Sequence, residues 1–164
     1  SVLVGEAANS DVYWVMDNLG SQKNDYFAGN SFDAKNCTGE IIAKSVAAEK
    51  CRVNFIGEID ITLEGGGTDS YLKQDVLMLD DTCFVEAVPS LEIKTNDVKA
   101  GHGVSISKLN DDRLFYLMSR GVDKESARTL VLNGFLKSVY SEFGDEDLVE
   151  KIDSILAKDL NLKV

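Results

Sequence analysis

Residues 89–121 read PSLEIKTNDVKAGHGVSISKLNDDRLFYLMSRG, and the hydrophobic pattern changes within them. Up to about Ile106, apolar residues recur at every second position, the period of a β-strand, with a bend predicted at Gly101-His102-Gly103. After Asn110 the apolar residues recur at helical spacing, and Gly121 stands where a helix would stop. This stretch therefore predicts the junction between a β-rich region and a helical region.

The two sides of this junction predict two domains. Residues 1–107 read as short strands separated by Gly, Asn and Asp turns, which is typical of a sandwich, a barrel or a β-solenoid. The spacing between strand starts varies, so no fixed repeat selects among the three. Residues 108–164 read as helices over about 111–120 and 124–142, the latter capped by Asp123, and a third capped by Asp145. The apolar stripes predicted to face the core are Ala127, Leu130, Val131, Gly134 and Phe135 in the second helix and Leu148, Ile152, Ile155 and Leu156 in the third.

The composition excludes several classes of protein. The formal net charge is −11, from 28 acidic and 17 basic residues, which disfavours binding to nucleic acid or to an anionic membrane. No apolar run approaches the roughly 20 residues of a membrane span. The three cysteines include no CxxC spacing, which predicts a reducing compartment rather than a disulfide framework. We therefore expect a cytoplasmic protein that neither binds nucleic acid nor spans a membrane.

Enzymatic motifs are missing from the sequence. There is no GxxxxGK[ST] phosphate-binding loop, so the chain is not expected to bind ATP itself. A single histidine, and no GxSxG, leave no set of nucleophile, base and orienting residue for a hydrolase. We expect a non-catalytic protein.

Several motifs occur in a recognisable order between residues 36 and 143. In chain order they are Asn36-Cys37-Thr38-Gly39-Glu40, Phe55-x-Gly57-x-Ile59, Pro89-x-Leu91-Glu92-Ile93, Asp97-Val98-Lys99, His102-Gly103, Leu114-Phe115-Tyr116-Leu117, Ser119-Arg120-Gly121 and Gly134-Phe135. In this order and spacing they resemble the SufB/SufD family, the scaffold subunits of SUF iron–sulfur cluster assembly. The resemblance implies a mainly β fold with α: a right-handed parallel β-helix over residues 1–107, forming the C-terminal rungs of a longer β-helix, followed by a C-terminal helical domain over residues 108–164.

The resemblance also implies partners. Two SufB/SufD-like subunits would pair through their β-helices as a homo- or heterodimer, and each would bind a SufC-like ABC ATPase through its C-terminal helices. In this sequence the ATPase contact maps onto Asp111, Phe115, Tyr116 and Arg120. ATPase activity would reside in that partner. No cofactor would be bound stably, and a transient iron–sulfur cluster would form at the dimer interface.

His102 is the first candidate for a cluster-assembly or metal-binding residue. Imidazole titrates near neutral pH and binds iron, and flanking glycines would let a partner backbone or a cluster approach closely. The alternative is a histidine satisfied by a backbone carbonyl. Ala100 stands where many relatives carry a cysteine, and Gly103 where the SufB branch carries a glutamate. The chain therefore resembles the SufD branch or a single-subunit relative, with His102 in a supporting role.

The cysteines are the second candidates, because thiolates hold most iron–sulfur clusters. Cys37, Cys51 and Cys83 are 14 and 32 residues apart, so they would stack on one face of a solenoid whose rung took about 15 residues. Cys37 is the preferred ligand since it lies in a family-like motif. The alternative is that all three are small buried hydrophobic residues.

Two other functions remain open at this point. Right-handed β-helices also include polysaccharide lyases, in which carboxylates bind calcium and a basic residue removes a proton. The helical tail and the odd cysteine count argue against this class. The other alternative is a purely structural, truncated paralogue of the family.

Overall fold

The computed structural model describes residues 1–109, 111–141 and 143–160, without the side chains of residues 111 and 113. Strands come first and helices last along the chain. The strands are β1 (Val2–Leu3), β2 (Val12–Asn18), β3 (Lys23–Phe32), β4 (Thr38–Ala47), β5 (Arg52–Ile61), β6 (Thr68–Met78), β7 (Phe84–Ile93) and β8 (Val98–Lys108). The helices are α1 (Asp111–Met118), α2 (Lys124–Tyr140) and α3 (Glu146–Asp159).

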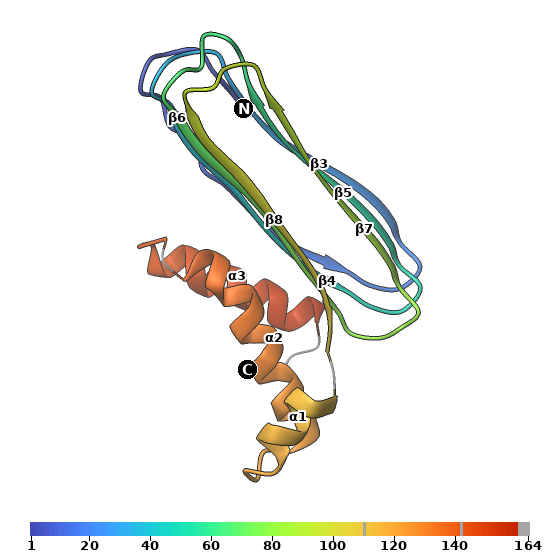
Figure 1. Cartoon of the computed structure of the whole chain (residues 1–164). Coiled ribbons are helices and arrows are strands. Elements are labelled where there is room, and N and C mark those ends of the chain that lie inside the picture. The colour runs from blue at the N-terminus through green and yellow to red at the C-terminus, as the bar shows by residue number, and fades with distance from the viewer. Residues whose placement is uncertain (110, 142, 161–164) are drawn as a thin grey trace.

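The strands form two parallel sheets that the chain visits alternately. Sheet A has the order β1-β3-β5-β7 and sheet B the order β2-β4-β6-β8, and every pairing is parallel. Each pair of successive strands therefore completes one turn of a flattened coil, as Figure 1 shows. The fold is a parallel β-solenoid with C-terminal helices, which confirms the predicted fold class and excludes the sandwich and the barrel.

The strand register reveals the repeat that the sequence concealed. Val12 pairs with Ile41, a separation of 29 residues, whereas Arg52 pairs with Phe84, a separation of 32. The remaining strand pairs have separations between these two values. A stretch of about 15 residues is thus one strand and its loop, or half a turn, and not a complete rung. Loops of unequal length shift the strand starts, which is why the period is not visible in the sequence.

The solenoid interior lies between the two sheets. Inward-facing side chains alternate with outward-facing ones along each strand, and the largest fully buried ones include Phe32, Phe55 and Ile59. Trp14 stacks on Phe55 with ring centroids 5.7 Å apart. Each such side chain contributes about 1.5–3 kcal/mol when it is fully buried. Stacking of the same positions in successive turns therefore provides most of the stability of this region.

β8 corrects one prediction at the junction. No bend occurs at Gly101-His102-Gly103, because β8 continues through all three residues and pairs regularly with Tyr71, Leu72 and Lys73 of β6. The two glycines have no positive φ. The long neighbouring strand β6 provides a template that keeps the glycines extended.

Helices α2 and α3 pack on the outer face of sheet B (Figure 1). Val46 and Leu77, which pair in register, form the apolar patch on which the helices lie. Lys44 adds a polar contact: its Nζ donates to Ser138 Oγ at 2.7 Å and lies 4.7 Å from the centroid of the Phe135 ring. Burial lowers the pKa of Lys44. Sheet B is thus covered by helices near its C-terminal end, whereas sheet A has no helix over it.

The helix ends follow the predicted signals. The Asp123 carboxylate accepts hydrogen bonds from the backbone N–H groups of Glu125 and Ser126, and the Asp145 carboxylate accepts one from Leu148. Gly121 has a φ of +90°, which suits a glycine after the end of a helix.

The predicted apolar stripes were partly wrong. Leu130 is 54% exposed, and the buried residues of α2 are Ala127, Thr129, Leu132, Leu136, Val139 and Tyr140. In α3, Leu148 and Ile155 are exposed and only Leu156 is fully buried. The buried face is rotated because α2 packs against sheet B and against α3 at once. Within the described residues, no helix combines the length and hydrophobicity that a membrane crossing requires.

Candidate functional site

His102 lies in the middle of β8, the last strand of the solenoid, and its side chain is exposed. Its register partner on β6 is Leu72, which is fully buried in the interior. Side chains in register on parallel strands point to the same face of the sheet. His102 therefore projects from the inner face of sheet B, and it is exposed because no further turn covers β8.

Tyr71 explains the glycines on either side of His102. A Cβ on Gly101 would lie 3.2 Å from the Tyr71 ring, and one on Gly103 would lie 2.8 Å from its hydroxyl oxygen. The ring thus lies along the outer face of β8, over both glycines. In this chain the glycines make room for Tyr71, and the space that we expected for a partner or a cluster is occupied on that face. The inner face, where His102 projects, is the open one.

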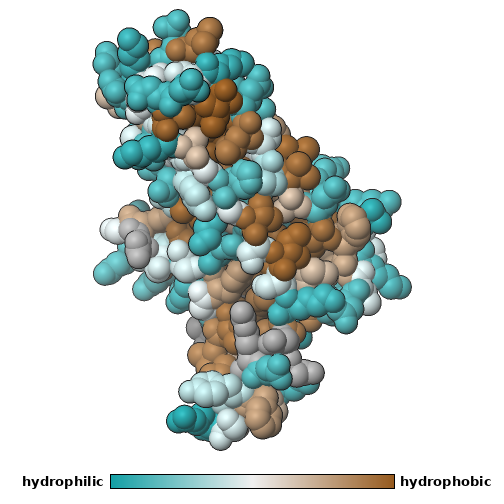
Figure 2. All heavy atoms as spheres, viewed as in Figure 1, coloured by the Kyte–Doolittle hydropathy of each residue, from teal (hydrophilic) through white to brown (hydrophobic). Residues whose placement is uncertain are grey.

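The whole last turn of the solenoid is open in the same way. Val104 and Ile106 on β8 are 39% and 45% exposed, although their register partners Gln74 and Val76 are buried. On β7, Ile93 is 40% exposed and the other inward-facing residues are only partly buried. Figure 2 views the molecule from this side and shows hydrophobic residues along the face. We call this face, formed by the inward-facing residues of β7 and β8, the open end.

The open end also carries two unpaired strand edges. In each sheet the last strand has a single neighbour, β5 for β7 and β6 for β8. One edge of each strand therefore presents backbone N–H and C=O groups without a sheet partner, which favours pairing with another strand. Sequence reasoning missed this surface, because alternation indicates which residues face inward but not which turn is the last.

Cys37 does not lie beside His102. It precedes β4 by one residue and is fully buried, and its thiol contacts the carbonyl oxygens of Gly5 at 3.4 Å and Lys35 at 3.7 Å. The β4–β6–β8 register aligns Cys37 with Val98, four residues before His102. The two positions are thus separated by two strands and by about 13 Å along the strand direction. The structure does not unite these candidates in one site.

The other two cysteines also differ from the predicted stack of three. Cys51 and Cys83 precede the paired residues Arg52 and Phe84, so they occupy the same place in two successive turns. Both are buried in a small apolar cluster of their own, apart from the cluster that contains Cys37. Among the described residues, no group of three or more His, Cys, Asp or Glu side chains is arranged to hold a metal ion.

The predicted partner interface on α1 presents aromatic rings to solvent. Phe115 is 70% exposed and Tyr116 is 61% exposed, while the guanidinium of Arg120 lies 5.5 Å from the centroid of the Tyr116 ring. Leu114, on the opposite side, is buried. Asp111 begins the helix, but its side chain lies outside the described part of the structure. Three of the four predicted interface residues therefore share one exposed cluster.

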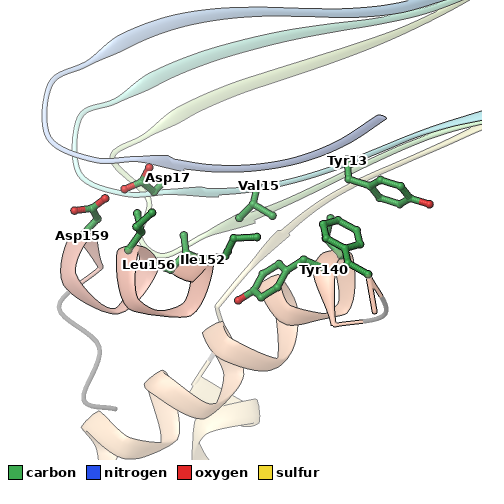
Figure 3. A pocket seen from close by; sticks show the side chains of 10 residues that line it. Tyr13, Val15, Asp17, Tyr140, Ile152, Leu156 and Asp159 are labelled. Carbon is green, nitrogen blue, oxygen red and sulfur yellow. The ribbon is translucent and has the colours of Figure 1, made fainter. Parts of the chain in front are cut away.

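A separate groove of about 280 Å³ lies between β2 and the helices α2 and α3. Figure 3 shows Tyr13, Val15 and Asp17 of β2 on one side, with Ile152, Leu156 and Asp159 of α3 and Tyr140 of α2 on the other. The lining is mostly apolar, and it contains neither histidine nor cysteine among the described residues. We assign the groove to the seam along which the helices pack on sheet B.

Comparison with known proteins identifies the family. A family model described as "SUF system FeS cluster assembly, SufBD core domain" matches residues 1–135, most of the chain. The chain belongs to the SufBD family. An iron–sulfur cluster assembly SufBD family protein of Mycobacterium tuberculosis is 31% identical over 148 residues, which cover 90% of this chain and 18% of that protein.

Two further relatives in the SufBD family give the same result. The iron–sulfur cluster assembly protein SufD of Escherichia coli is 28% identical over 116 residues, which cover 71% of this chain and 27% of SufD. A SufBD family protein of Staphylococcus epidermidis is 28% identical over 149 residues, covering 91% of this chain and 32% of that protein. This SufBD chain thus spans less than a third of the length of each of these relatives.

Proposed function

We propose that this chain forms part of a non-catalytic scaffold subunit of SUF iron–sulfur cluster assembly. In this proposal it pairs with a second SufB/SufD-like subunit through the open end and binds a SufC-like ABC ATPase through its helices. The observation that carries the proposal is the open end itself, where inward-facing residues are exposed beside unpaired strand edges. Membership of the SufBD family supports the assignment to SUF assembly.

The pairing would use the free edge of β8. Its 11 residues present unpaired backbone groups, and a second copy related by a two-fold axis would offer the same edge in the antiparallel direction. Such pairing satisfies these groups and removes Val104 and Ile106 from water. A SufB- or SufD-like subunit with the same fold would fit equally, so the surface supports both a homodimer and a heterodimer.

His102 would bring an iron ligand to this interface. It projects from the same face of β8 as Val104, so the pairing that buries Val104 also places the imidazole next to the partner subunit. Ala100 and Gly103 supply no additional ligand. A transient cluster, which is the cargo of the scaffold, would therefore take its remaining ligands from the partner, and His102 has a supporting role.

The ATPase would contact α1. Phe115, Tyr116 and Arg120 are of the residue types that dominate protein interfaces, and they form one exposed cluster on a short helix that projects away from the solenoid (Figure 1). ATP hydrolysis takes place in the partner in this proposal, and the scaffold transmits or receives the resulting movement.

The pairing is tested with Val104→Glu in the full-length protein, purified anaerobically with its partners. A carboxylate at the open end would be buried without a partner, so we expect loss of the scaffold dimer or heterodimer in native mass spectrometry. Val88→Glu is the matched control, because Val88 is 41% exposed on the outer face of sheet A. Equal dissociation of both variants, or of neither, would contradict the proposal.

The ATPase contact is tested with the double variant Phe115→Ser/Tyr116→Ser. We expect the variant to lose co-purification with the SufC-like ATPase and to lose its effect on ATP hydrolysis by that protein. Phe27→Ser is the control, since Phe27 is also an exposed aromatic residue but lies on sheet A. Retention of the ATPase by the double variant would show that another surface binds it.

The role of His102 is tested with His102→Ala in the same complex. We expect an unchanged subunit stoichiometry, together with less iron and acid-labile sulfide per complex and a weaker visible absorbance after anaerobic assembly. An unchanged cluster content would assign His102 a structural role, as in the truncated-paralogue hypothesis.

A further inference from the structure

Cys51 and Cys83 occupy equivalent positions in two successive turns of sheet A. Each residue immediately precedes a strand, and the backbone N–H of Phe84 donates to the carbonyl oxygen of Cys51 at 2.9 Å. Residues in register on neighbouring strands are about 4.8 Å apart. This spacing lies within the Cα–Cα range of disulfides, about 4.4–6.8 Å. The backbone therefore places the two cysteines within bonding range without a change of fold.

The two loops that carry these cysteines are fastened together. Loop 48–51 and loop 79–83 meet at Asp80, whose carboxylate accepts hydrogen bonds from the Glu49 N–H at 2.6 Å and from the Thr82 N–H at 2.8 Å. The Thr82 hydroxyl also donates to the Asp80 carboxylate at 2.7 Å. The hydrogen bond from Glu49 is the main reason why the pKa of Asp80 is lowered. Because the loops are held in this arrangement, the two thiols stay close together.

The thiols share an apolar environment and interact with each other. Cys51 is fully buried and Cys83 is 7% exposed, and both belong to one cluster. The other buried members are Ala47, Val53 and Val76, with Tyr26, Met78 and Val85 packed against them. The Cys83 thiol contacts the backbone carbonyls of Ala47 and Asp80 and also the Cys51 thiol. Burial raises the pKa of both thiols.

We propose that Cys51 and Cys83 form a redox-modification site, a dithiol that a peroxide oxidises to an intramolecular disulfide between successive turns. Cys83 reacts first because it is the accessible thiol of the pair. Its sulfur attacks one peroxide oxygen, the O–O bond breaks, and a sulfenic acid and one water form. The Cys51 sulfur then attacks the Cys83 sulfur, the S–O bond breaks, and a second water leaves. In sum, two thiols and one hydrogen peroxide give one disulfide and two waters.

Cys37 provides an internal control within the same chain. It is equally buried, but it lies in another cluster and its thiol contacts only backbone carbonyls in the printed structure. Burial and composition are therefore matched, and only the neighbouring thiol differs. The disulfide would also close a loop between two turns, which restricts the unfolded chain and raises the melting temperature.

The test uses the full-length protein, reduced, separated from reductant and exposed to hydrogen peroxide under native conditions. Acid quenching, alkylation in denaturant and peptide mapping by mass spectrometry then follow. We expect a peptide pair joined through Cys51 and Cys83, lighter than the separate peptides by two hydrogen atoms, and an alkylated Cys37. The oxidised protein should melt several degrees higher than the reduced protein.

Three variants make the result specific. Cys51→Ser and Cys83→Ser should each abolish the linked peptides and the rise in melting temperature, whereas Cys37→Ser should preserve both. If both thiols remain alkylatable in the native protein at peroxide levels that oxidise the unfolded chain, the proposal is wrong. It is also wrong if Cys37 or a second chain supplies the bonded sulfur. No partner protein is needed, so this outcome is independent of the scaffold proposal.

Discussion

Strands β6 and β8 have the same orientation and opposite surroundings. Leu72, Gln74 and Val76 of β6 are buried, whereas their partners in register on β8, His102, Val104 and Ile106, are exposed. The two sets point to the same face of sheet B. The difference arises because β6 has a strand on both sides and β8 has one. Burial in a solenoid is thus a property of the position in the stack, and an apolar residue in the last turn is available to a partner.

The largest effect is expected from truncating an interior residue. Ile59→Ala removes a fully buried side chain from the solenoid interior and should cost about 2–5 kcal/mol of the free energy of unfolding. Ile106→Ala is the control, because Ile106 also faces inward but is half exposed, and it should cost less than about 1 kcal/mol in the unpaired chain. Chemical denaturation measures both. Similar losses would mean that the open end is packed as well as the interior.

Overfilling the interior should have the next largest effect. A Cβ on Gly57 would lie 2.7 Å and 2.9 Å from the two methyl carbons of Leu72 and 3.0 Å from Gln74 Nε2. Gly57→Ala should therefore destabilise the chain by about 1–3 kcal/mol. Gly29→Ala on sheet A is the control, since its new methyl group would meet only the exposed Phe27 ring and the Glu58 Cβ. A smaller loss for Gly57→Ala than for Gly29→Ala would contradict the close packing of this turn.

The helical region depends more on polar contacts than the solenoid interior does. Asp153 accepts a hydrogen bond from the Tyr140 hydroxyl at 2.7 Å and lies 2.6 Å from Lys137 Nζ. Asp153→Ala removes both contacts and should cost about 1–2 kcal/mol, measured by thermal or urea unfolding. A loss below a few tenths of a kcal/mol would show that these contacts do not hold α2 to α3.

The same carboxylate gives the helical region a pH dependence. Burial alone would raise the pKa of Asp153, but the hydrogen bonds from Lys137 and Tyr140 outweigh burial and hold the pKa below its ordinary value. A lowered pKa stabilises the folded state above the ordinary value of about 3.9, and this stabilisation disappears as pH falls through the lowered pKa. Asp153→Asn should therefore flatten the loss of stability between pH 5 and pH 2, at about those values. An unaltered acid limb would assign that loss to other carboxylates.

The smallest effect is expected beside His102. The methyl group of Gly103→Ala would lie 2.8 Å from the Tyr71 hydroxyl oxygen, which is the free end of a 43% exposed side chain. Tyr71 can move aside, so the loss should stay within about 0.5 kcal/mol. The change should be visible in the Tyr71 ring resonances by NMR. A loss as large as that of Gly57→Ala would mean that Tyr71 is fixed against β8.

Much of the local structure was predictable because its causes are local. Asp123 and Asp145 cap helices, and Gly121 follows the end of α1, since a cap needs only a side chain and the next few N–H groups. The alternating strands and the helical tail were predicted for the same reason. The face of α2 that is buried was not, because it depends on the neighbours that the helix meets.

The candidate site divides in the same way. The sequence indicated that His102 belongs to a strand and that Phe115 and Tyr116 belong to a helix, and both placements are correct. The glycines beside His102 were read as space for a partner, yet Tyr71, some 30 residues earlier in the chain, occupies that space on the outer face. The separation of Cys37 from the pair of Cys51 and Cys83 was equally invisible in the sequence.

The sequence by itself determined the types of elements, their order and their ends, because periodicity and capping act within a few residues. The tertiary structure alone decided the register, the open end, the cover over Gly101 and Gly103, and the pairing of Cys51 with Cys83. Each of these depends on which residue lies on the adjacent strand, and that residue is 29 to 32 positions away in the chain. Loops of unequal length set this offset, so only the folded chain shows which side chains meet.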